Sequence, residues 1–234
     1  MNASDIQCLL LDFGGTLDAD GETWLRRFYR LYQEEGFDVP LEKFEKAFYA
    51  TDDALNGSKK IRNAGLLETI KYQVDGVFKN LKFREKRRRQ RIIESFFIAS
   101  VRQIQRNLPL LKRLASHYRV GMISNFYGNL EVILQEQGLK PLLDPRLDST
   151  QEGMLKPDPA FFQKAIDRWK CAPSQILMVG DSPNRDMQGA KGVGMPHVWL
   201  CNASNFKKET CCPGDPKISS FLELEPLLLP KDTL

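Results

Sequence analysis

The stretch LLLDFGGTLDAD, residues 9–20, places an aspartate at the end of an apolar run and follows it with two glycines and a threonine. The apolar run, QCLLLD at residues 7–12, is short and is closed by turn-forming residues, which predicts a buried β-strand that ends at Asp12. An acidic side chain at the end of a buried strand calls for a reason, because an unpaired carboxylate is costly to bury. The residue two places further on, Gly14, offers no second acid.

Short apolar runs recur along the chain and alternate with helical patterns. Further strands are predicted at residues 118–124, 142–148, 176–180 and 196–200. Helices are predicted at residues 109–117, 129–137, 158–170, 183–192 and 219–229. Pro109 suits the first turn of one of these helices, and Gly138 suits the end of another. The alternation predicts an α/β fold with a mostly parallel sheet and helices on both faces.

Residues 18–108 differ from the rest because they carry helical periodicity and almost no strand signal. Four apolar stripes with spacings of three and four residues run through Trp24–Tyr32, Leu41–Leu55, Leu66–Leu81 and Ile92–Ile104. Four amphipathic helices can bury a core of their own. We therefore predict two domains, an α/β core at residues 1–17 and 109–234 and an inserted all-α helical bundle at residues 18–108.

The composition is typical of a globular protein, since 42% of the 234 residues are hydrophobic and 27% are charged. No apolar run approaches the roughly 18 residues that span a bilayer. The polar start MNASDIQ does not resemble a signal peptide, so we expect a cytoplasmic protein with no membrane partner. The five cysteines fit neither a disulfide framework nor a zinc site, and only the pair Cys211–Cys212 leaves a metal or redox role open.

The net charge of +4 is unevenly distributed along the chain. Residues 18–108 hold 19 Lys/Arg and 14 Asp/Glu, a balance of +5, whereas the remainder holds 15 and 16, a balance of −1. Seven of the ten residues in KFREKRRRQR, residues 82–91, are basic. This run is interpreted as a solvated helix face or as weak steering of anionic substrates. Because it has one aromatic residue and the chain carries no nucleic-acid-binding module, we do not expect nucleic-acid binding.

Polar residues follow several of the predicted strands, where the ligands of parallel sheets bind. The candidates are Asp12, Ser124 with Asn125, Lys156 in the loop GMLKPDP, and Asp181 with Asp186. Taken singly, each has a structural interpretation, such as an N-cap for Ser124. Together they favour phosphoryl transfer, with three carboxylates as hard ligands for Mg²⁺, Asp12 as a nucleophile and Lys156 as the countercharge. The glycines at positions 14 and 15 let the backbone approach a phosphate closely.

Four segments in order, DFGGTLDAD, ISN, LKPDP and GDSPNRDMQGA, resemble the four motifs of the haloacid dehalogenase-like (HAD) hydrolase superfamily. The resemblance covers the whole chain and implies a Rossmann-like core with a helical cap between the first two motifs. It implies that Asp12 is the nucleophile and a metal ligand. By the same resemblance, Ser124, Asn125, Gly14, Gly15 and Lys156 bind phosphate, Lys156 stabilises charge, and Asp181, Asp186 and the Gly14 carbonyl complete an Mg²⁺ site.

Gly14 departs from the family pattern, in which a second aspartate protonates the leaving oxygen and then activates water. A positioned acid or base contributes about 10²–10⁴-fold to the rate. In our preferred interpretation the protein is an Mg²⁺-dependent phosphatase for a small phosphorylated metabolite. A good leaving group, a water, the substrate or a nearby acid such as Asp18 or Asp20 then covers part of the loss.

Two alternatives stay open. In one, the chain resembles phosphonoacetaldehyde hydrolase, which has a small residue at the position of Gly14 and a Schiff-base lysine in its cap; Lys59 and Lys60 are the candidates. In the other, it is a degenerate member that binds a phosphorylated ligand or a partner and turns over poorly. A dehalogenase is not expected, because such enzymes need no metal and this chain keeps Asp181 and Asp186. The protein is expected to be a monomer or a homodimer.

Overall fold

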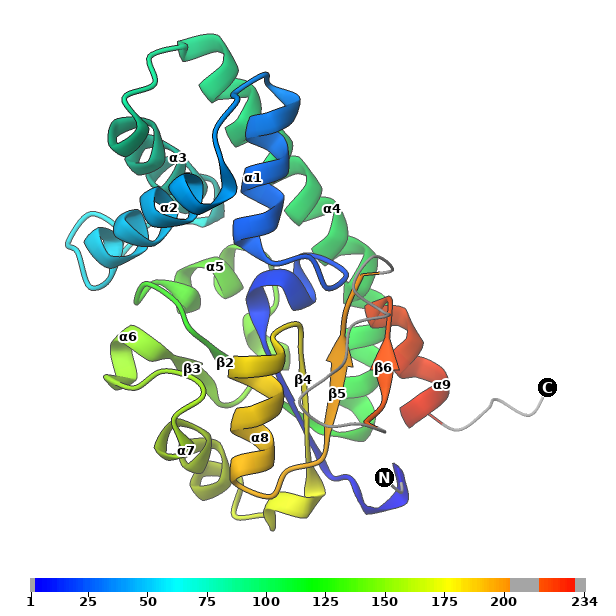
Figure 1. Ribbon diagram of the computed structural model, residues 1–234. Coiled ribbons are helices and arrows are strands. Elements are labelled where there is room, and N and C mark those ends of the chain that lie inside the picture. Colours follow the sequence, from blue (N-terminus) through cyan, green and yellow to red (C-terminus); the bar gives the residue numbers. More distant parts are fainter. Residues whose placement is uncertain (1–2, 203–214, 230–234) are drawn as a thin grey trace.

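The computed structural model describes residues 3–202 and 215–229 of the chain (Figure 1). A helical part at the top of the view stands on a part built around a parallel sheet. The pair Cys211–Cys212, for which a metal or redox role was considered, lies outside the described residues.

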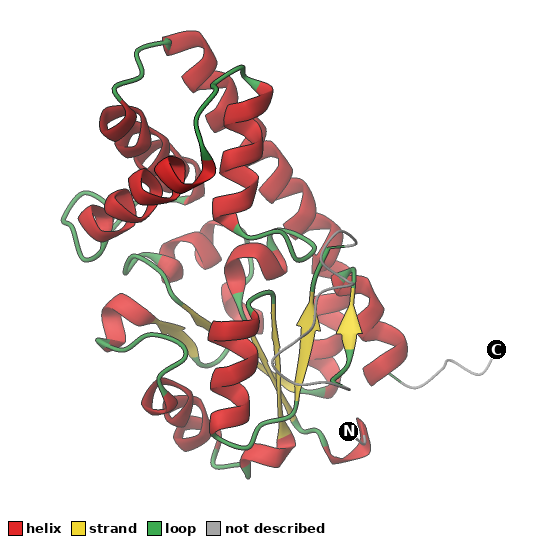
Figure 2. Cartoon of the chain, in the orientation of Figure 1, coloured by secondary structure: helices red, strands yellow, loops and turns green. Residues whose placement is uncertain are grey.

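All strands of the sheet run parallel, in the order β3-β2-β1-β4-β5-β6 (Figure 2). Their bounds are Cys8–Leu11 for β1, Arg119–Ser124 for β2, Arg146–Asp148 for β3, Ile176–Gly180 for β4, His197–Leu200 for β5 and Lys217–Ile218 for β6. The predicted α/β class with a parallel sheet is therefore confirmed. The central position of β1, between β2 and β4, brings Asp12 to the middle of the carboxyl edge.

The sheet is covered on both faces because successive residues of β1 point to opposite sides. Leu9 and Leu11 belong to a core shared with α4 (Lys86–His117), α5 (Leu130–Glu136) and α9 (Leu224–Leu228). Cys8 and Leu10 belong to a second core shared with α7 (Pro159–Trp169) and α8 (Gln188–Gly192). All four β1 side chains are fully buried, which explains why the strand reads as an unbroken apolar run.

Four helices separate β1 from β2 and form what we call the helical insert: α1 (Trp24–Glu34), α2 (Leu41–Leu55), α3 (Leu66–Leu81) and the first part of α4. Each contains one of the four predicted apolar stripes. Aromatic rings fill the space between them, with Phe28 stacked on Phe96 at a centroid distance of 4.0 Å and Tyr32 packed edge-on against Phe44 at 4.9 Å. The insert thus has a core of its own, as the amphipathic stripes predict.

The prediction that a separate helix begins at Pro109 was wrong. Pro109 lies inside α4, a continuous helix of 32 residues. Proline normally disfavours a helix interior because it lacks an amide proton. Here packing outweighs that preference, since Ile92, Phe96 and Ile104 are buried before the proline and Leu110 and Leu114 after it. The predicted domain boundary between residues 108 and 109 falls within this helix, and the division into two domains stays a prediction.

Three further differences concern short elements. The run 142–148 forms a strand only at Arg146–Asp148, and a 3₁₀ turn occupies Lys140–Leu142. The segment 183–192 begins with one π-helical turn at Pro183–Met187 before α8. The closing segment supplies β6, which was not predicted, and then a 3₁₀ turn at Phe221–Glu223 before α9. Elements of two to five residues are too short for periodicity to define them.

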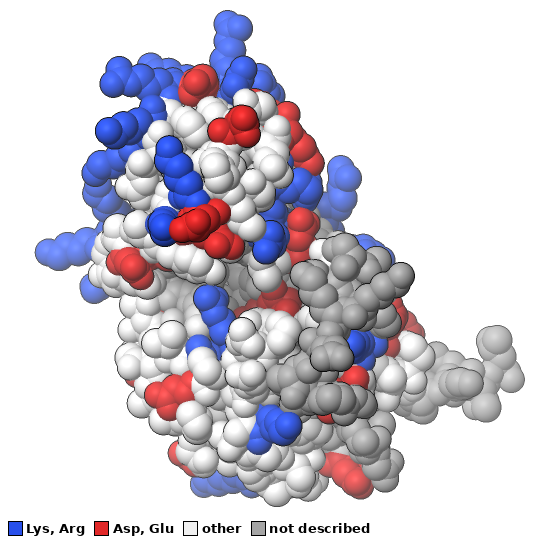
Figure 3. Space-filling model, viewed as in Figure 1, with Lys and Arg blue, Asp and Glu red and all other residues white. Residues whose placement is uncertain are grey.

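The basic run 82–91 follows α3 and opens α4. Several of its side chains have partners elsewhere: Arg91 pairs with Glu35 just after α1 at 2.5 Å, Arg89 pairs with Asp75 on α3, and Arg88 lies 5.5 Å from the ring centre of Phe37 in the loop after α1. Figure 3 shows Lys and Arg gathered over the insert at the top of the view, in keeping with the positive balance of residues 18–108. No helix in the described part of the chain is both long enough and apolar enough to cross a membrane.

Candidate active site

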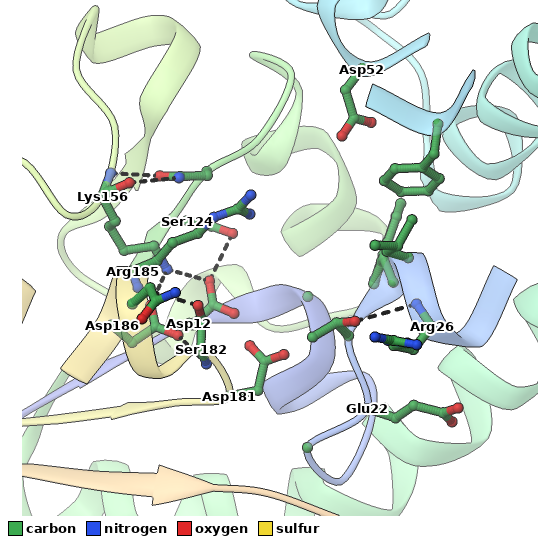
Figure 4. Close-up of a pocket in the computed structure, with 18 of the residues that line it drawn as sticks. Asp12, Glu22, Arg26, Asp52, Ser124, Lys156, Asp181, Ser182, Arg185 and Asp186 are labelled. Carbon is green, nitrogen blue, oxygen red and sulfur yellow. Dashed lines mark hydrogen bonds and ion pairs between the residues drawn. The ribbon is translucent and has the colours of Figure 1, made fainter. Parts of the chain in front are cut away.

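The ends of β1, β2 and β4 bring Asp12, Ser124 and Asp181 together at the carboxyl edge of the sheet (Figure 4). The pairing of β1 with β4 continues one residue past the strand, where the amide of Asp12 donates to the carbonyl of Val179 at 3.0 Å. This bond fixes the backbone of Asp12 at the carboxyl edge of the sheet. Asp12 is nearly buried, with 5% of its surface exposed.

Lys156 is the cation at the centre of the site. Its ammonium lies 2.6 Å from Oδ1 of Asp12 and 2.6 Å from Oδ1 of Asp186, and it donates to the carbonyl of Ile123 at 2.9 Å. Burial disfavours the charge on this side chain, but the two carboxylates outweigh it and raise the pKa of Lys156 above its ordinary value. Lys156 is therefore a permanent positive charge that holds two acids together.

Ser124 and Asn125, the residues of the predicted phosphate-binding motif, both take part in this arrangement. The hydroxyl of Ser124 donates to Oδ1 of Asp12 at 3.1 Å. The amide of Asn125 forms two hydrogen bonds with the backbone of Lys156, to its carbonyl at 3.0 Å and from its amide at 2.7 Å. Asn125 thus positions the loop that carries Lys156, which is a positioning role.

Two further carboxylates complete the acidic group. Asp12, Asp181 and Asp186 each offer an oxygen within 4.8 Å of the others, and all three are buried. Burial and then the charges of Asp12 and Asp186 raise the pKa of Asp181 well above its ordinary value. Burial also raises the pKa of Asp186, although Lys156 opposes this effect. Three crowded acids share one lysine, so the site is short of positive charge.

Glycines make room for these acids. A Cβ at Gly15 would overlap the carboxylate of Asp181, and a Cβ at Gly180 would overlap that of Asp186. Gly15 also has a φ of +90°, which side chains rarely tolerate. Hard, clustered carboxylate oxygens held against bare backbone are the donor set that Mg²⁺ prefers. The residues present therefore fit the predicted metal, with Asp12, Asp181 and Asp186 as its side-chain ligands.

Gly14 lies against the indole ring of Trp24, a contact that no sequence motif indicates. A Cβ at Gly14 would stand 3.2 Å from Nε1 and 3.3 Å from Cδ1 of Trp24. The indole donates to Oδ2 of Asp18 at 2.9 Å, and it packs edge-on against Phe126 and Phe96. Trp24 thus crowds position 14, where a side chain would make close contacts with the indole. Both residues line the same cavity.

Asp18, considered above as a replacement acid, is fully occupied by structural partners. It forms a buried ion pair with Arg27 at 2.7 Å, and it accepts hydrogen bonds from the Gly15 amide and the Ser100 hydroxyl. The Arg27 guanidinium in turn covers the ring of Phe96 at 4.0 Å. The carboxylate of Asp18 is completely buried and carries no exposed edge. It lies in the segment between β1 and α1, at the start of the insert.

Asp20, the other acid considered, is also held by structural partners. It pairs with Arg106 at 2.8 Å and accepts from the amide of Phe221 at 3.0 Å. The two lysines of the phosphonatase-like alternative, Lys59 and Lys60, are exposed. Neither these two lysines nor the two replacement acids are among the residues that line the cavity over Asp12.

The cavity over the acids has a volume of about 850 Å³ and lies between the sheet edge and the insert. One wall is formed by the strand ends and the segments that follow them, and most of the predicted site residues line it: Asp12, Gly14, Ser124, Asn125, Lys156, Asp181 and Asp186. The insert supplies a second wall that includes Trp24, Tyr49 and Asp52. Sequence patterns gave no sign of this wall, because its residues share no motif.

An open parallel sheet with an aspartate, a lysine and two further acids at its carboxyl edge is typical of α/β enzymes that place a nucleophilic carboxylate at the end of a strand. A sequence profile described as haloacid dehalogenase-like hydrolase matches residues 6–194. The chain belongs to this family and is a hydrolase.

Individual relatives agree with this assignment. The chain is 30% identical to the pyrimidine 5'-nucleotidase YjjG of Escherichia coli over 138 residues, which are 56% of this chain and 61% of that protein. It is 36% identical to a glyceraldehyde 3-phosphate phosphatase of Pyrococcus furiosus over 93 residues, 39% of this chain and 38% of that protein. A haloacid dehalogenase-like hydrolase domain-containing protein 3 of Bos taurus is matched over 32% of its length, so such matches span only part of these relatives.

Solved structures share the fold across nearly the whole chain. A dehalogenase with an intermediate complex superposes with a TM-score of 0.64 at 20% identity, covering 96% of this chain and 97% of that one. An HAD phosphatase from Thermococcus onnurineus superposes with a TM-score of 0.56 at 21% identity, covering 95% and 98%. At this level of identity the likeness concerns the fold alone.

Proposed function

We propose that the chain is an Mg²⁺-dependent phosphatase that moves the phosphoryl group of a small phosphorylated metabolite first to Asp12 and then to water. The observation that carries the proposal is the position of Asp12. One oxygen of its carboxylate is held by both Lys156 and Ser124, at 2.6 and 3.1 Å, and the side chain lines a cavity large enough for a metabolite. A carboxylate fixed in this way is aimed before the substrate arrives.

The chain's own groups can supply most of what phosphoryl transfer needs. Lys156 lowers the repulsion between the attacking carboxylate and an anionic phosphate, since its charge lies next to Asp12. Ser124 can turn its hydroxyl from Asp12 to a phosphate oxygen. An Mg²⁺ ion held by Asp12, Asp181 and Asp186 would supply the remaining positive charge. The insert covers the site from the opposite side of the cavity.

The relatives' names support this reaction, because the nucleotidase and the glyceraldehyde 3-phosphate phosphatase are both named for phosphate substrates. A phosphoserine phosphatase of Thermus thermophilus, 41% identical over 54 residues, is named in the same way. The phosphonatase-like alternative needs a lysine over Asp12. Lys59 and Lys60 are exposed and lie outside the cavity lining, so the geometry favours the phosphatase.

Turnover of p-nitrophenyl phosphate and acetyl phosphate with Mg²⁺ tests the proposal. The wild type should release phosphate, Asp12→Asn should release essentially none, and EDTA should abolish the wild-type activity reversibly. A degenerate binding protein would instead show the same negligible rate for both proteins. Equal rates for wild type and Asp12→Asn would contradict the proposal.

A further inference from the structure

The reaction needs a proton donor for the leaving oxygen, and position 14 supplies none. The acids that line the cavity are Asp12, Glu22, Glu45, Asp52, Asp181 and Asp186. Three of these form the acidic group at the strand ends. Glu22 is held in an ion pair with Arg30 at 3.1 Å. Asp18 and Asp20 lie outside the lining. Among the described acids of the cavity lining, the remaining candidates for the proton donor are Glu45 and Asp52, both on α2.

Asp52 differs from Glu45 in being fixed. The phenol of Tyr127, in the loop after β2, donates to Oδ1 of Asp52 at 2.5 Å. Tyr127 is itself buried, and its ring packs against Phe126 at a centroid distance of 5.1 Å. The carboxyl group of Asp52 therefore has a defined direction, which the half-exposed side chain of Glu45 lacks.

Asp52 faces the acids from the opposite wall. In Figure 4 its side chain projects from α2 towards the space in which Asp12, Ser124 and Arg185 lie. A phosphate bound at Asp12 and Ser124 would place its leaving group away from the strand end, because the attacking and leaving oxygens lie roughly in line. The leaving group therefore points to the wall that the insert forms.

We propose that Asp52, held by Tyr127, donates the proton to the leaving oxygen in place of the acid that position 14 lacks. This inference rests on the phosphatase activity proposed above. In the first step an oxygen of Asp12 bonds to phosphorus, the bond from phosphorus to the leaving oxygen breaks, and the Asp52 proton passes to that oxygen to give an alcohol. In the second step water attacks phosphorus and returns one proton to Asp52, while the bond to Asp12 breaks and phosphate departs.

The charges around Asp52 suit a group that gives up and regains a proton near neutral pH. Burial raises the pKa of Asp52 to about 6. The Tyr127 hydrogen bond, the Arg185 charge and the Gln73 amide act in the opposite direction, and Asp53 adds to the increase. A general acid works best when its pKa lies near the working pH. Asp52 is thus protonated often enough to donate and basic enough to accept the proton back.

Leaving-group dependence separates a proton donor from a residue that only supports the structure. Alkyl phosphates need protonation of the leaving oxygen, whereas p-nitrophenyl and acetyl phosphate leave as stable anions. Asp52→Asn should therefore lower kcat/KM, which reports the steps up to departure of the leaving group, by about 10²-fold or more for an alkyl phosphate such as glycerol 3-phosphate, and by less than about tenfold for the two activated esters. The neighbouring exposed acid gives a matched control, Asp53→Asn, and Glu45→Gln is a second control from the same cavity wall.

The pH profile provides a second test that keeps the carboxyl group in place. The wild-type kcat/KM for the alkyl phosphate should fall as the pH rises above about 6, because Asp52 loses its proton. Tyr127→Phe removes a hydrogen bond that stabilises the carboxylate, so the pKa of Asp52 should rise and this fall should move to higher pH. Asp52→Asn should lack the fall.

Three results would each overturn the assignment of Asp52: an equal loss of kcat/KM for all esters in Asp52→Asn, no loss for any ester, or an alkaline fall that Tyr127→Phe leaves unmoved. Because Tyr127→Phe retains Asp52, it tests the assignment even if Asp52→Asn fails to fold. If the wild type shows no turnover that depends on Asp12, the phosphatase proposal itself fails, and the role of Asp52 falls with it. The two failures are therefore distinguishable.

Discussion

Trp24 and Gly14 act as a pair at the level of single residues. The indole would lie in tight contact with a Cβ at position 14, at 3.2 Å, and its hydrogen bond to Asp18 holds it there. An aspartate at position 14 would require the indole, which packs against Phe126 and Phe96, to shift slightly. The packing of Trp24 therefore disfavours a second acid at position 14.

Gly14→Asp should consequently fail to restore the missing acid. We expect no increase in the turnover of an alkyl phosphate and a loss of stability of about 1–3 kcal/mol, typical of overpacking. Steady-state kinetics and urea unfolding measure the two effects. A gain of tenfold or more in kcat for Gly14→Asp alone would show that Trp24 moves aside and that the space is available.

Asp18 should prove structural. Asp18→Asn leaves the buried guanidinium of Arg27 without its countercharge, and breaking such a pair costs about 3–5 kcal/mol. Glu42→Gln breaks the exposed pair of Glu42 with Lys46 and serves as a control, for which at most about 1 kcal/mol is expected. Urea unfolding compares the two variants. Equal stabilities of the two variants would contradict a structural role for Asp18.

Sequence alone predicted that Asp12, Ser124, Lys156 and Asp181 lie near one edge, because parallel strands share a carboxyl edge, and in the structure all four line one cavity. It could not place Asp52 or Trp24. Their positions depend on how the insert packs over the sheet, and this packing leaves no motif in the chain. The partner of Asp52, Tyr127, lies 75 residues away in sequence.

The helix α4 shows at the level of elements how packing overrides a local preference. Its first part lies in the insert and its last part packs on the sheet, so one rigid element joins the two. The apolar stripe that predicted a helix at residues 92–104 was correct. The signal at Pro109 was misleading, because proline suits a helix start as well as it disfavours an interior.

Pro109→Ala should therefore stabilise the protein. The alanine restores an amide donor in the middle of α4 and removes a residue that costs about 3 kcal/mol relative to alanine in a helix interior. Tertiary packing adapted to the proline will reduce the gain, and we expect about 1–2 kcal/mol by urea unfolding, within the range of that propensity difference. A destabilised variant would mean that the fold depends on the proline at this point.

In the whole molecule, hydrogen bonds from α5 fasten the insert to the core in addition to the connection through α4. The buried amide of Asn129, at the start of α5, donates to the carbonyl of Ala64 at 2.8 Å and to the hydroxyl of Thr69 at 2.7 Å. Glu136, at the end of α5, accepts from the amide of Leu66 at 2.8 Å. These bonds and the Tyr127–Asp52 bond fix the cavity wall that carries Asp52.

Asn129→Ala should loosen this attachment. We expect a loss of stability of about 1–3 kcal/mol, because the buried partners at Ala64 and Thr69 lose a donor, and a higher KM because the wall is less well placed. Asn63→Ala, at the exposed position just before Ala64, is the control and should change neither quantity. Identical behaviour of the two variants would show that α5 does not hold the insert.

The most direct test of the central claim is the mass of the protein during turnover. The wild type, incubated with acetyl phosphate and Mg²⁺ and then quenched with acid, should carry one phosphoryl group on the peptide that contains Asp12. Asp52→Asn should carry it as well, since an activated ester needs no proton donor, and Asp12→Asn should carry none. A wild type that releases phosphate without any such adduct, or an adduct that persists in Asp12→Asn, would contradict phosphoryl transfer through Asp12.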